Sequence, residues 1–342
     1  MAPTASMRYF DRNMKAILVC SALLLLISVP CAAQSEASSI PQATPSPFPD
    51  VVRVEAQPDK GFLYPYYLYI PPELRGEKNN GALQTLLVLP NNTGQTNDDL
   101  AVHDASAKRL AEGRRKLAGQ LKVALLAPVF PRPKTDGRIY THALDRDSLV
   151  TEKKELKRFD LQLISMIDDA RKRLRADGLS CDERVLMYGF SAAAMFTNRF
   201  AMLHPERVRA AAFGSPGGWA MAPIASWKGK PLRYPIGTAD FEIVTGKKLD
   251  LEKLRKVPLF LFMGSDDPND SVVYRDSYDQ EDQDLIFDLF GKTLIERWPV
   301  TVAIYKENLP AATLRLYPNV GHSVTKEMWS DVTTFFTQHI RD

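Results

Sequence analysis

One serine stands in a sequence context that could make its hydroxyl a nucleophile. Ser191 lies in Gly189-Phe-Ser-Ala-Ala193, directly after the apolar run Val185–Tyr188 and at the start of an alanine-rich segment. A serine on a sharp strand-to-helix turn exposes its Oγ, and the residues two positions away on either side must be small. Gly189 meets this need, and Ala193 stands where the commoner motif has a second glycine. The alternative is an ordinary tight turn in which Ser191 only caps a helix.

A nucleophilic serine needs a base, and His322 is the histidine best placed to act as one. It follows the predicted last strand, Thr313–Tyr317, in the sequence Pro-Asn-Val-Gly-His-Ser and precedes the C-terminal helical segment. The base in turn needs a carboxylate that fixes its tautomer. The other four histidines are weaker candidates, because they lie in predicted helices, at a helix end or in a long insert: His103, His339, His204 and His142.

The carboxylate is expected just after an apolar run that ends at Met263. The residues that follow are Gly264, Ser265, Asp266, Asp267, Pro268, Asn269 and Asp270. We predict Asp267, the third residue after the glycine, as the partner of His322, and Asp266 and Asp270 stay open as alternatives. Asp240 has no apolar strand before it, and we expect it to be a structural or substrate-wall residue.

Apolar runs alternate with amphipathic segments along the chain, which predicts an α/β fold. Several of the runs are apolar throughout, as is typical of strands buried on both faces of a parallel sheet. The first two strands are joined by a short loop and should pair antiparallel, and right-handed β-α-β crossovers follow. The predicted strands are Val51–Val54, Leu63–Ile70, Leu86–Leu89, Val123–Ala127, Val185–Tyr188, Ala210–Phe213, Leu259–Met263 and Thr313–Tyr317, and the predicted helices are 98–118, 155–176, 192–203, 283–290 and 324–340.

Two long segments do not fit this alternation. They are Pro128–Thr151 and Gly214–Val257, and both are rich in proline and aromatic or charged residues. Both follow the carboxyl ends of predicted strands, which is the edge where open α/β sheets bind ligands. Loops of this length in a compact domain usually have a functional role. We therefore expect them to form walls or lids of a site.

The composition is that of an ordinary globular protein. The 342 residues are 45% hydrophobic and 25% charged, which excludes collagen-like, coiled-coil and wholly disordered proteins. The net charge is +3 and no basic stripe carries interleaved aromatics, so nucleic acid is not an expected partner.

The amino terminus resembles a secretory signal peptide. A basic start is followed by the uncharged, mostly apolar stretch Ala16–Val29 and by Cys31-Ala-Ala, which predicts cleavage before Gln34. The stretch is shorter than the roughly 20 residues of a membrane span. A retained anchor and a lipid on Cys31 are the alternatives. Residues 34–50 are predicted to be a disordered, proline-rich leader and 51–342 to be one α/β domain.

Cleavage at this point would leave Cys181 as the only thiol. The mature chain could then form no internal disulfide, although an exported protein enters a compartment that permits one. Cysteine-ligated metal sites are excluded by the same count, and no H-E-x-x-H motif is present. We therefore expect neither a metal nor another cofactor.

The motifs Gly-Phe-Ser-Ala-Ala, Gly-Ser-Asp-Asp and Val-Gly-His-Ser, in this order, resemble those of the α/β-hydrolase superfamily. Within it the chain is similar to secreted bacterial esterases and polyhydroxybutyrate-depolymerase-like hydrolases, over roughly residues 60 to 340. The resemblance implies an α/β-hydrolase fold, with a mostly parallel eight-stranded sheet and helices on both faces. It also implies Ser191 as the nucleophile, His322 as general base and then acid, and Asp267 as its orienter.

The resemblance further implies two backbone amides that would bind the oxyanion. The first is the amide of Ala192, directly after the serine. The family's usual His-Gly after the third strand is replaced here by Pro90-Asn-Asn-Thr-Gly94. Carried over to this loop, the second donor is the amide of Asn92.

These observations together predict a secreted or periplasmic serine hydrolase that cleaves a carboxylic ester through an acyl-enzyme. Its substrate would be a small-molecule or polymeric ester, with no cofactor and no stable membrane association after signal cleavage. The alternatives are a peptidase of the same superfamily and a catalytically silent α/β-hydrolase that acts as a binding protein. The altered elbow and oxyanion loop are the grounds for the silent alternative.

The first testable prediction concerns the mature amino terminus. Expression with export should yield a protein that starts near Gln34, because the apolar stretch is short and ends in small residues. Amino-terminal sequencing and intact mass of the exported protein measure this. A start before residue 20, or a lipid on Cys31, would contradict it.

Overall fold

The computed structural model describes residues 50–75 and 83–340. The predicted signal peptide, 1–33, and residues 34–49 of the predicted leader lie outside the described residues. The chain divides into two units, Met1–Pro45 and Ser46–Asp342, and the architecture below is that of the second.

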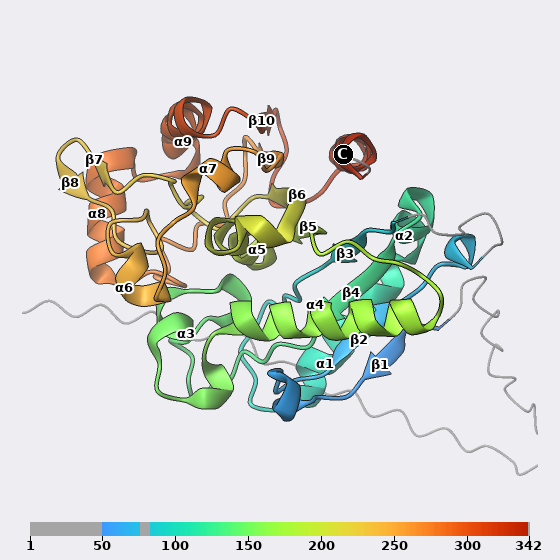
Figure 1. Cartoon of the computed structure of the whole chain (residues 1–342). Coiled ribbons are helices and arrows are strands. Elements are labelled where there is room, and N and C mark those ends of the chain that lie inside the picture. Colours follow the sequence, from blue (N-terminus) through green and yellow to red (C-terminus); the bar gives the residue numbers. More distant parts are fainter. Residues whose placement is uncertain (1–49, 76–82, 341–342) are drawn as a thin grey trace, which may run out of the picture. The chain divides into compact units, whose positions relative to one another are not determined.

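All eight predicted runs form strands of one sheet (Figure 1). Its strand order is β1-β2-β4-β3-β5-β6-β9-β10. The pairs β1·β2 and β2·β4 are antiparallel, and every other pair of neighbours is parallel. The expected mostly parallel eight-stranded sheet is therefore confirmed. The strands are β1 (Val52–Val54), β2 (Tyr66–Tyr69), β3 (Leu86–Val88), β4 (Ala124–Pro128), β5 (Val185–Phe190), β6 (Val208–Gly214), β9 (Leu259–Gly264) and β10 (Ala312–Tyr317).

Each predicted helical segment contains a helix, and short helices that were not predicted also form in the two inserts. The segment 98–118 forms two helices that break at Arg114, and α4 starts only at Phe159, after a 3-10 turn. One 15-residue helix, α9, was not predicted, because Pro299 within it is typical of a helix end. The helices are α1 (Leu100–Gly113), α2 (Arg115–Leu121), α3 (Arg146–Val150), α4 (Phe159–Ala176), α5 (Ala192–Leu203), α6 (Phe241–Thr245), α7 (Leu251–Leu254), α8 (Gln280–Phe290), α9 (Leu294–Asn308) and α10 (Lys326–His339).

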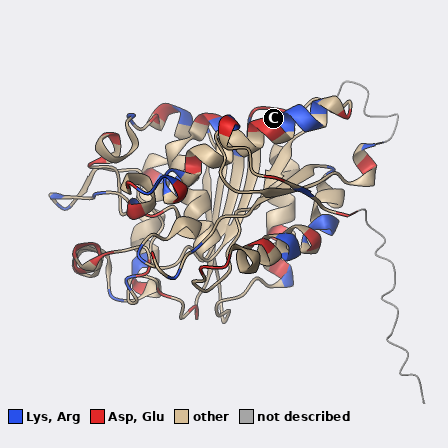
Figure 2. Cartoon of the chain, turned by 90° about the horizontal axis from the view of Figure 1, so that it is seen from below, with Lys and Arg blue, Asp and Glu red and all other residues tan. Residues whose placement is uncertain are grey.

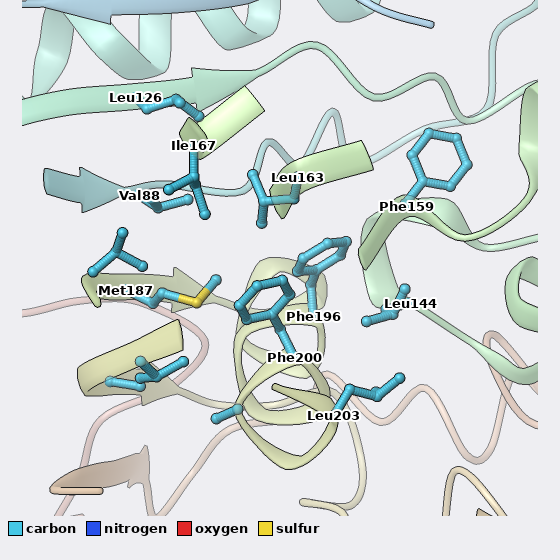
Figure 3. Close-up of a cluster of buried hydrophobic side chains, with 14 of the residues drawn as sticks. Val88, Leu126, Leu144, Phe159, Leu163, Ile167, Met187, Phe196, Phe200 and Leu203 are labelled. Carbon is cyan, nitrogen blue, oxygen red and sulfur yellow. The ribbon is translucent and has the colours of Figure 1, made fainter. Parts of the chain in front are cut away.

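The sheet is covered on both faces, because successive side chains of its buried strands point to opposite sides. One face packs against α4 and α5 (Figure 3). The other face packs against α1, α2 and α10. In β5, for example, Val185 and Met187 belong to the first core and Leu186 and Tyr188 to the second. This two-sided burial explains why the strands are apolar throughout.

A third apolar cluster joins both long inserts to the start of α5. It includes Ala192 and Met195 of that helix, Tyr140 of the first insert and Trp219 of the second. The Trp219 ring stacks on Phe290 of α8, with ring centroids 4.0 Å apart. The second insert also contains a small hairpin of β7 (Ser226–Trp227) and β8 (Lys230–Pro231). The inserts are therefore packed parts of the domain at the carboxyl edge of the sheet.

Most charged residues lie around the sheet, and its eight strands carry only Arg53, Arg209 and Arg315. Figure 2 shows the central strands almost free of charge, with both signs interspersed over the surrounding helices and loops. None of the described helices is long and apolar enough to span a membrane.

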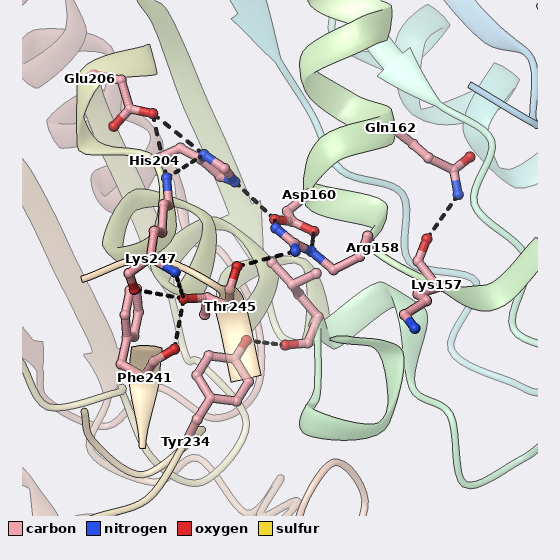
Figure 4. A network of polar contacts seen from close by, with 11 residues as sticks. Lys157, Arg158, Asp160, Gln162, His204, Glu206, Tyr234, Phe241, Thr245 and Lys247 are labelled. Carbon is pink, nitrogen blue, oxygen red and sulfur yellow. Dashed lines mark hydrogen bonds and ion pairs between the residues drawn. The ribbon is translucent and has the colours of Figure 1, made fainter. Parts of the chain in front are cut away.

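A buried polar network ties the start of α4 to the end of α5 (Figure 4). Asp160 is fully buried and accepts two hydrogen bonds from Arg158, at 2.9 and 2.8 Å. It also pairs with His204 Nε2 at 2.9 Å, and His204 Nδ1 lies 3.0 Å from Lys247 Nζ. Burial alone would raise the pKa of Asp160, but the hydrogen bonds from His204 and Arg158 outweigh it and lower that pKa to about 2.

This network predicts how stability depends on pH. The depressed pKa of Asp160 stabilises the fold above about pH 4, and this stabilisation is lost as the pH falls from about 4 toward 2. Asp160→Asn should lower the free energy of unfolding by about 3 kcal/mol at pH 7, because it breaks a buried pair. Urea unfolding measures the free energy of unfolding of both proteins. The difference between the variant and wild type should become smaller below pH 4.

Asp168→Asn on the same helix is the matched control. Its carboxylate pairs with Arg171 and Arg207 but is 39% exposed, so its loss should cost less than about 1 kcal/mol. Equal losses of unfolding free energy in Asp160→Asn and Asp168→Asn would contradict the importance of the buried network.

Candidate active site

Ser191 lies on a strained turn between β5 and α5. Its backbone angles are φ 61° and ψ −127°, which side-chain-bearing residues rarely adopt. A Cβ added to Gly189 would lie 2.1 Å from the carbonyl oxygen of Ala193, so only glycine fits at that position. The Ser191 amide donates to the Gly214 carbonyl at the end of β6, at 3.0 Å. The turn therefore has the construction of a nucleophile elbow.

The structure brings His322 and Asp267 together. His322 Nδ1 lies 3.0 and 2.9 Å from the two carboxylate oxygens of Asp267. The Asp267 side chain is almost fully buried, whereas the His322 side chain is 26% exposed. The ring of Phe190, the last residue of β5, packs on the imidazole with centroids 4.8 Å apart. This carboxylate can hold the imidazole in one orientation and one tautomer.

Burial alone would raise the pKa of Asp267. The hydrogen bond from His322 and the backbone amide of Asn269, at 2.9 Å, outweigh burial and lower that pKa. The carboxylate therefore stays ionised in mildly acidic solution and remains an acceptor for the imidazole N–H.

Asn269 is a member of this group that the sequence analysis missed. Its Nδ2 lies 3.3 Å from Ser191 Oγ and 3.3 Å from His322 Nε2. Within the described part of the chain, no hydrogen bond joins Ser191 Oγ to His322 directly. Position 269 carries no motif of its own, and its proximity to Asp267 was the only available signal.

The loops that carry these residues meet through close backbone contacts. A Cβ added to Gly264 would lie 2.0 Å from the carbonyl oxygen of Val320, so glycine is needed where β9 ends. The Asp266 amide donates to that same carbonyl at 3.0 Å, and the Ser265 amide donates to Tyr317 at 2.8 Å. The acid loop and the histidine loop are thereby held side by side at the ends of β9 and β10.

The other candidate acids have different partners. Asp270 is buried and forms a two-point ion pair with Arg297 of α9, with both N–O distances 2.9 Å. Asp266 is exposed and accepts from the Ser265 hydroxyl. Asp240 pairs with Arg146. Asp267, the residue predicted from the spacing, is thus the acid that lies against His322.

The remaining histidines have structural partners. His103 Nδ1 lies 2.6 Å from Thr93 Oγ1, and His142 Nε2 lies 2.6 Å from the Phe130 carbonyl. Burial lowers the pKa of His142 to about 3, so this ring stays neutral in ordinary conditions. His204 belongs to the buried network with Asp160, and His339 packs on Phe335.

The two predicted oxyanion donors follow the carboxyl ends of two neighbouring parallel strands, β5 and β3. Ala192 is the first residue of α5, so its amide has no acceptor within the helix. Asn92 follows β3, the neighbour of β5, and its Oδ1 accepts from the Gly94 amide at 3.0 Å. The buried Asn91 anchors this loop by bonding both the amide and the carbonyl of Phe130. The loop is therefore anchored at the carboxyl edge of the sheet.

A polar cavity of about 560 Å³ lies between the first insert and the loop after Asn269. Ser191, Asp267 and His322 are not among its lining residues, so it is not the reacting centre itself. Burial raises the pKa of Asp145, one of its walls, to about 6. The lining consists of Arg138, Asp145, Arg146, Asp147, Tyr274, Arg275, Ser277, Tyr278, Asp279, Gln280 and Asp282.

The described part of the chain contains no cluster of metal-ligating side chains, and its one cysteine is buried. No group of three histidine, cysteine or carboxylate side chains there could hold a metal ion. Cys181 is buried, and burial raises the pKa of its thiol to about 11, so it is a poor nucleophile.

Comparison with known proteins bears on the fold. No protein-family model and no curated protein matches the chain. Poly(aspartic acid) hydrolase-1 from Sphingomonas sp. KT-1 is similar in structure, with a TM-score of 0.54 and 19% identity over 84% of this chain and 98% of that one. LpqC, a poly(3-hydroxybutyrate) depolymerase from Bordetella parapertussis, has a TM-score of 0.53 and 16% identity over 86% of this chain and 91% of that one. With the strand order and the turn at Ser191, these likenesses establish that the chain has the α/β-hydrolase fold.

Proposed function

We propose that this protein is an exported serine hydrolase that cleaves a carboxylic ester through an acyl-enzyme. Ser191 is the nucleophile, His322 the general base and then acid, and Asp267 the residue that orients the imidazole. The observation that carries the proposal is the strained Ser191 turn beside the bonded His322–Asp267 pair. A strained serine next to an oriented base is what nucleophilic catalysis needs.

The proposed reaction has two halves. Ser191 Oγ attacks the ester carbonyl carbon, and its proton passes to His322 Nε2 while the Ala192 and Asn92 amides bind the oxyanion. The tetrahedral intermediate collapses, and His322 gives the proton to the leaving alcohol. Water then attacks the acyl-enzyme, its proton passes to His322, and release of the acid returns the proton to Ser191.

The substrate is proposed to be a small-molecule or polymeric ester. The poly(3-hydroxybutyrate) depolymerase is named for an ester polymer, which favours this choice, whereas the poly(aspartic acid) hydrolase is named for an amide polymer. A peptidase activity is therefore kept as the second candidate. The same catalytic group serves both bonds, so a matched pair of p-nitrophenyl ester and p-nitroanilide substrates must separate them.

Export is part of the proposal and depends on residues 1–33. The basic start, the short apolar stretch and the Cys31-Ala-Ala end support cleavage before Gln34 and a secreted or periplasmic protein. A soluble mature enzyme without stable membrane attachment follows from the same cleavage.

A fluorophosphonate probe tests the proposed nucleophile. The purified protein should label on Ser191 and should hydrolyse p-nitrophenyl esters, because only an activated serine reacts with such a probe. Ser191→Ala should abolish labelling and leave an activity of about 10³-fold over water at most, from the oxyanion amides. Labelling and turnover across a series of acyl-chain lengths are the measurements.

Ser323→Ala is the control for the probe experiment, because it removes an exposed serine directly after His322. This variant should react with the fluorophosphonate probe and hydrolyse p-nitrophenyl esters as the wild type does. A wild-type protein that neither labels nor turns over would favour the catalytically silent binding protein.

The roles of the acidic residues give a separate prediction. Asp267→Asn should lower kcat by about 10⁴-fold, because an amide at this place favours the wrong imidazole tautomer. Asp266→Asn should change kcat by less than about threefold, since an exposed carboxylate that does not touch His322 contributes little there. Circular dichroism checks that both variants are folded. The reverse order of effects would show that Asp267 is not the orienter.

A further inference from the structure

The side chain of Asn269 lies between the proposed nucleophile and the proposed base. Its Nδ2 is 3.3 Å from Ser191 Oγ and 3.3 Å from His322 Nε2. One amide nitrogen carries two hydrogens, so it can donate to both atoms at once. No other described side chain bonds to both of these groups.

The hydrogen bonds around His322 fix which way this amide must face. Asp267 is an acceptor on the Nδ1 side, so Nδ1 carries the ring proton and Nε2 presents a lone pair. A lone pair is satisfied by the NH₂ of Asn269 and repelled by its carbonyl oxygen. The contact therefore supports, from the opposite side of the ring, the same tautomer that Asp267 favours.

The backbone on either side of Asn269 is pinned by buried groups. Its own amide donates to Asp267 Oδ1 at 2.9 Å. The next residue, Asp270, is anchored by Arg297, which also donates to the Gly218 carbonyl and is almost fully buried. Because the backbone is fixed on both sides of Asn269, its side chain loses little conformational entropy when it contacts Ser191 Oγ and His322 Nε2.

We propose that Asn269 is a positioning residue of the resting site. Its Nδ2 occupies the Nε2 lone pair of His322 and bonds Ser191 Oγ, and it must release the lone pair before the Ser191 proton can pass to Nε2. This inference rests on the proposed serine hydrolase function. It assigns Asn269 no contact with substrate. Its effect should therefore appear in kcat and in the titration of His322, and not in substrate affinity.

Asn269→Asp is the sharpest test, because it keeps the shape and exchanges the donor for a negative charge. The charged and aromatic groups that already face His322 are Asp267 on the Nδ1 side and the Phe190 ring on its face. A second carboxylate near Nε2 favours the imidazolium, so the titration midpoint of His322 should rise by about one pH unit. NMR of the imidazole measures this without any turnover, with His322→Gln used to assign the signal.

The same variant should change the kinetics in a defined direction. The acid limb of the kcat/KM profile should move to higher pH by the same amount, because more of His322 is protonated at a given pH. Asn269→Ala removes the donor without adding charge. It should raise kcat by up to about tenfold, the scale of one hydrogen bond that no longer competes with Ser191 for the lone pair, with KM within about twofold. The acid limb should move slightly to higher pH, because the lost donor favoured the neutral ring.

Asn319→Asp is the matched control. It adds the same charge to an exposed residue of the histidine loop, three positions before His322, and should shift the midpoint by less than about 0.3 units. An Asn269→Asp midpoint no higher than that of this control would overturn the proposal. So would an Asn269→Ala kcat that is unchanged or lowered.

The two proposals can fail separately. A shifted His322 signal in a protein that neither labels nor turns over would leave the Asn269 contact standing and reject the hydrolase function. An active wild type in which both Asn269 variants behave normally would leave the hydrolase function standing and reject the role of Asn269.

Discussion

The whole site depends on one close backbone approach, that of Gly189 to the carbonyl of Ala193. A single methyl group on Gly189 would lie 2.1 Å from that oxygen, so the chain can turn this sharply only without a side chain there. The turn forces Ser191 to a positive φ, which costs of order 1–3 kcal/mol. The two-sided burial of β5 and α5 supplies the packing that maintains the strain.

A second close backbone contact, at Gly264, brings together the two loops that carry Asp267 and His322. Gly264 lets the acid loop touch the backbone at Val320, so two loops from neighbouring parallel strands run together. This backbone contact holds the loop of Asp267 next to the loop of His322. The pair between Asp270 and Arg297 then fixes the loop from its other side. Glycine at strand ends and one buried ion pair thus help to position Ser191, Asp267 and His322 together with their own hydrogen bonds.

The sequence predicted what local patterns determine and missed what depends on distant packing. The eight strands are visible because two-sided burial makes them apolar throughout, and Asp267 follows from its spacing to Gly264. Helix α9 is hidden by Pro299, although its Arg297 is the anchor of Asp270. Asn269 could not be found, because its meeting with Ser191 arises only when the two loops are packed together.

A buried arginine ties the first insert to the helix that starts after Ser191. Arg199, on the helix that starts after the serine, is almost fully buried and donates to the Ala143 carbonyl and to Ser277 Oγ. One cation thereby holds the first insert and the loop after Asn269 against α5. The cavity between those two segments is lined by arginine, aspartate, tyrosine and amide groups, with no aliphatic side chain. Its lining includes none of Ser191, Asp267 and His322, so Arg199 and not the cavity itself connects these two segments to the helix that follows Ser191.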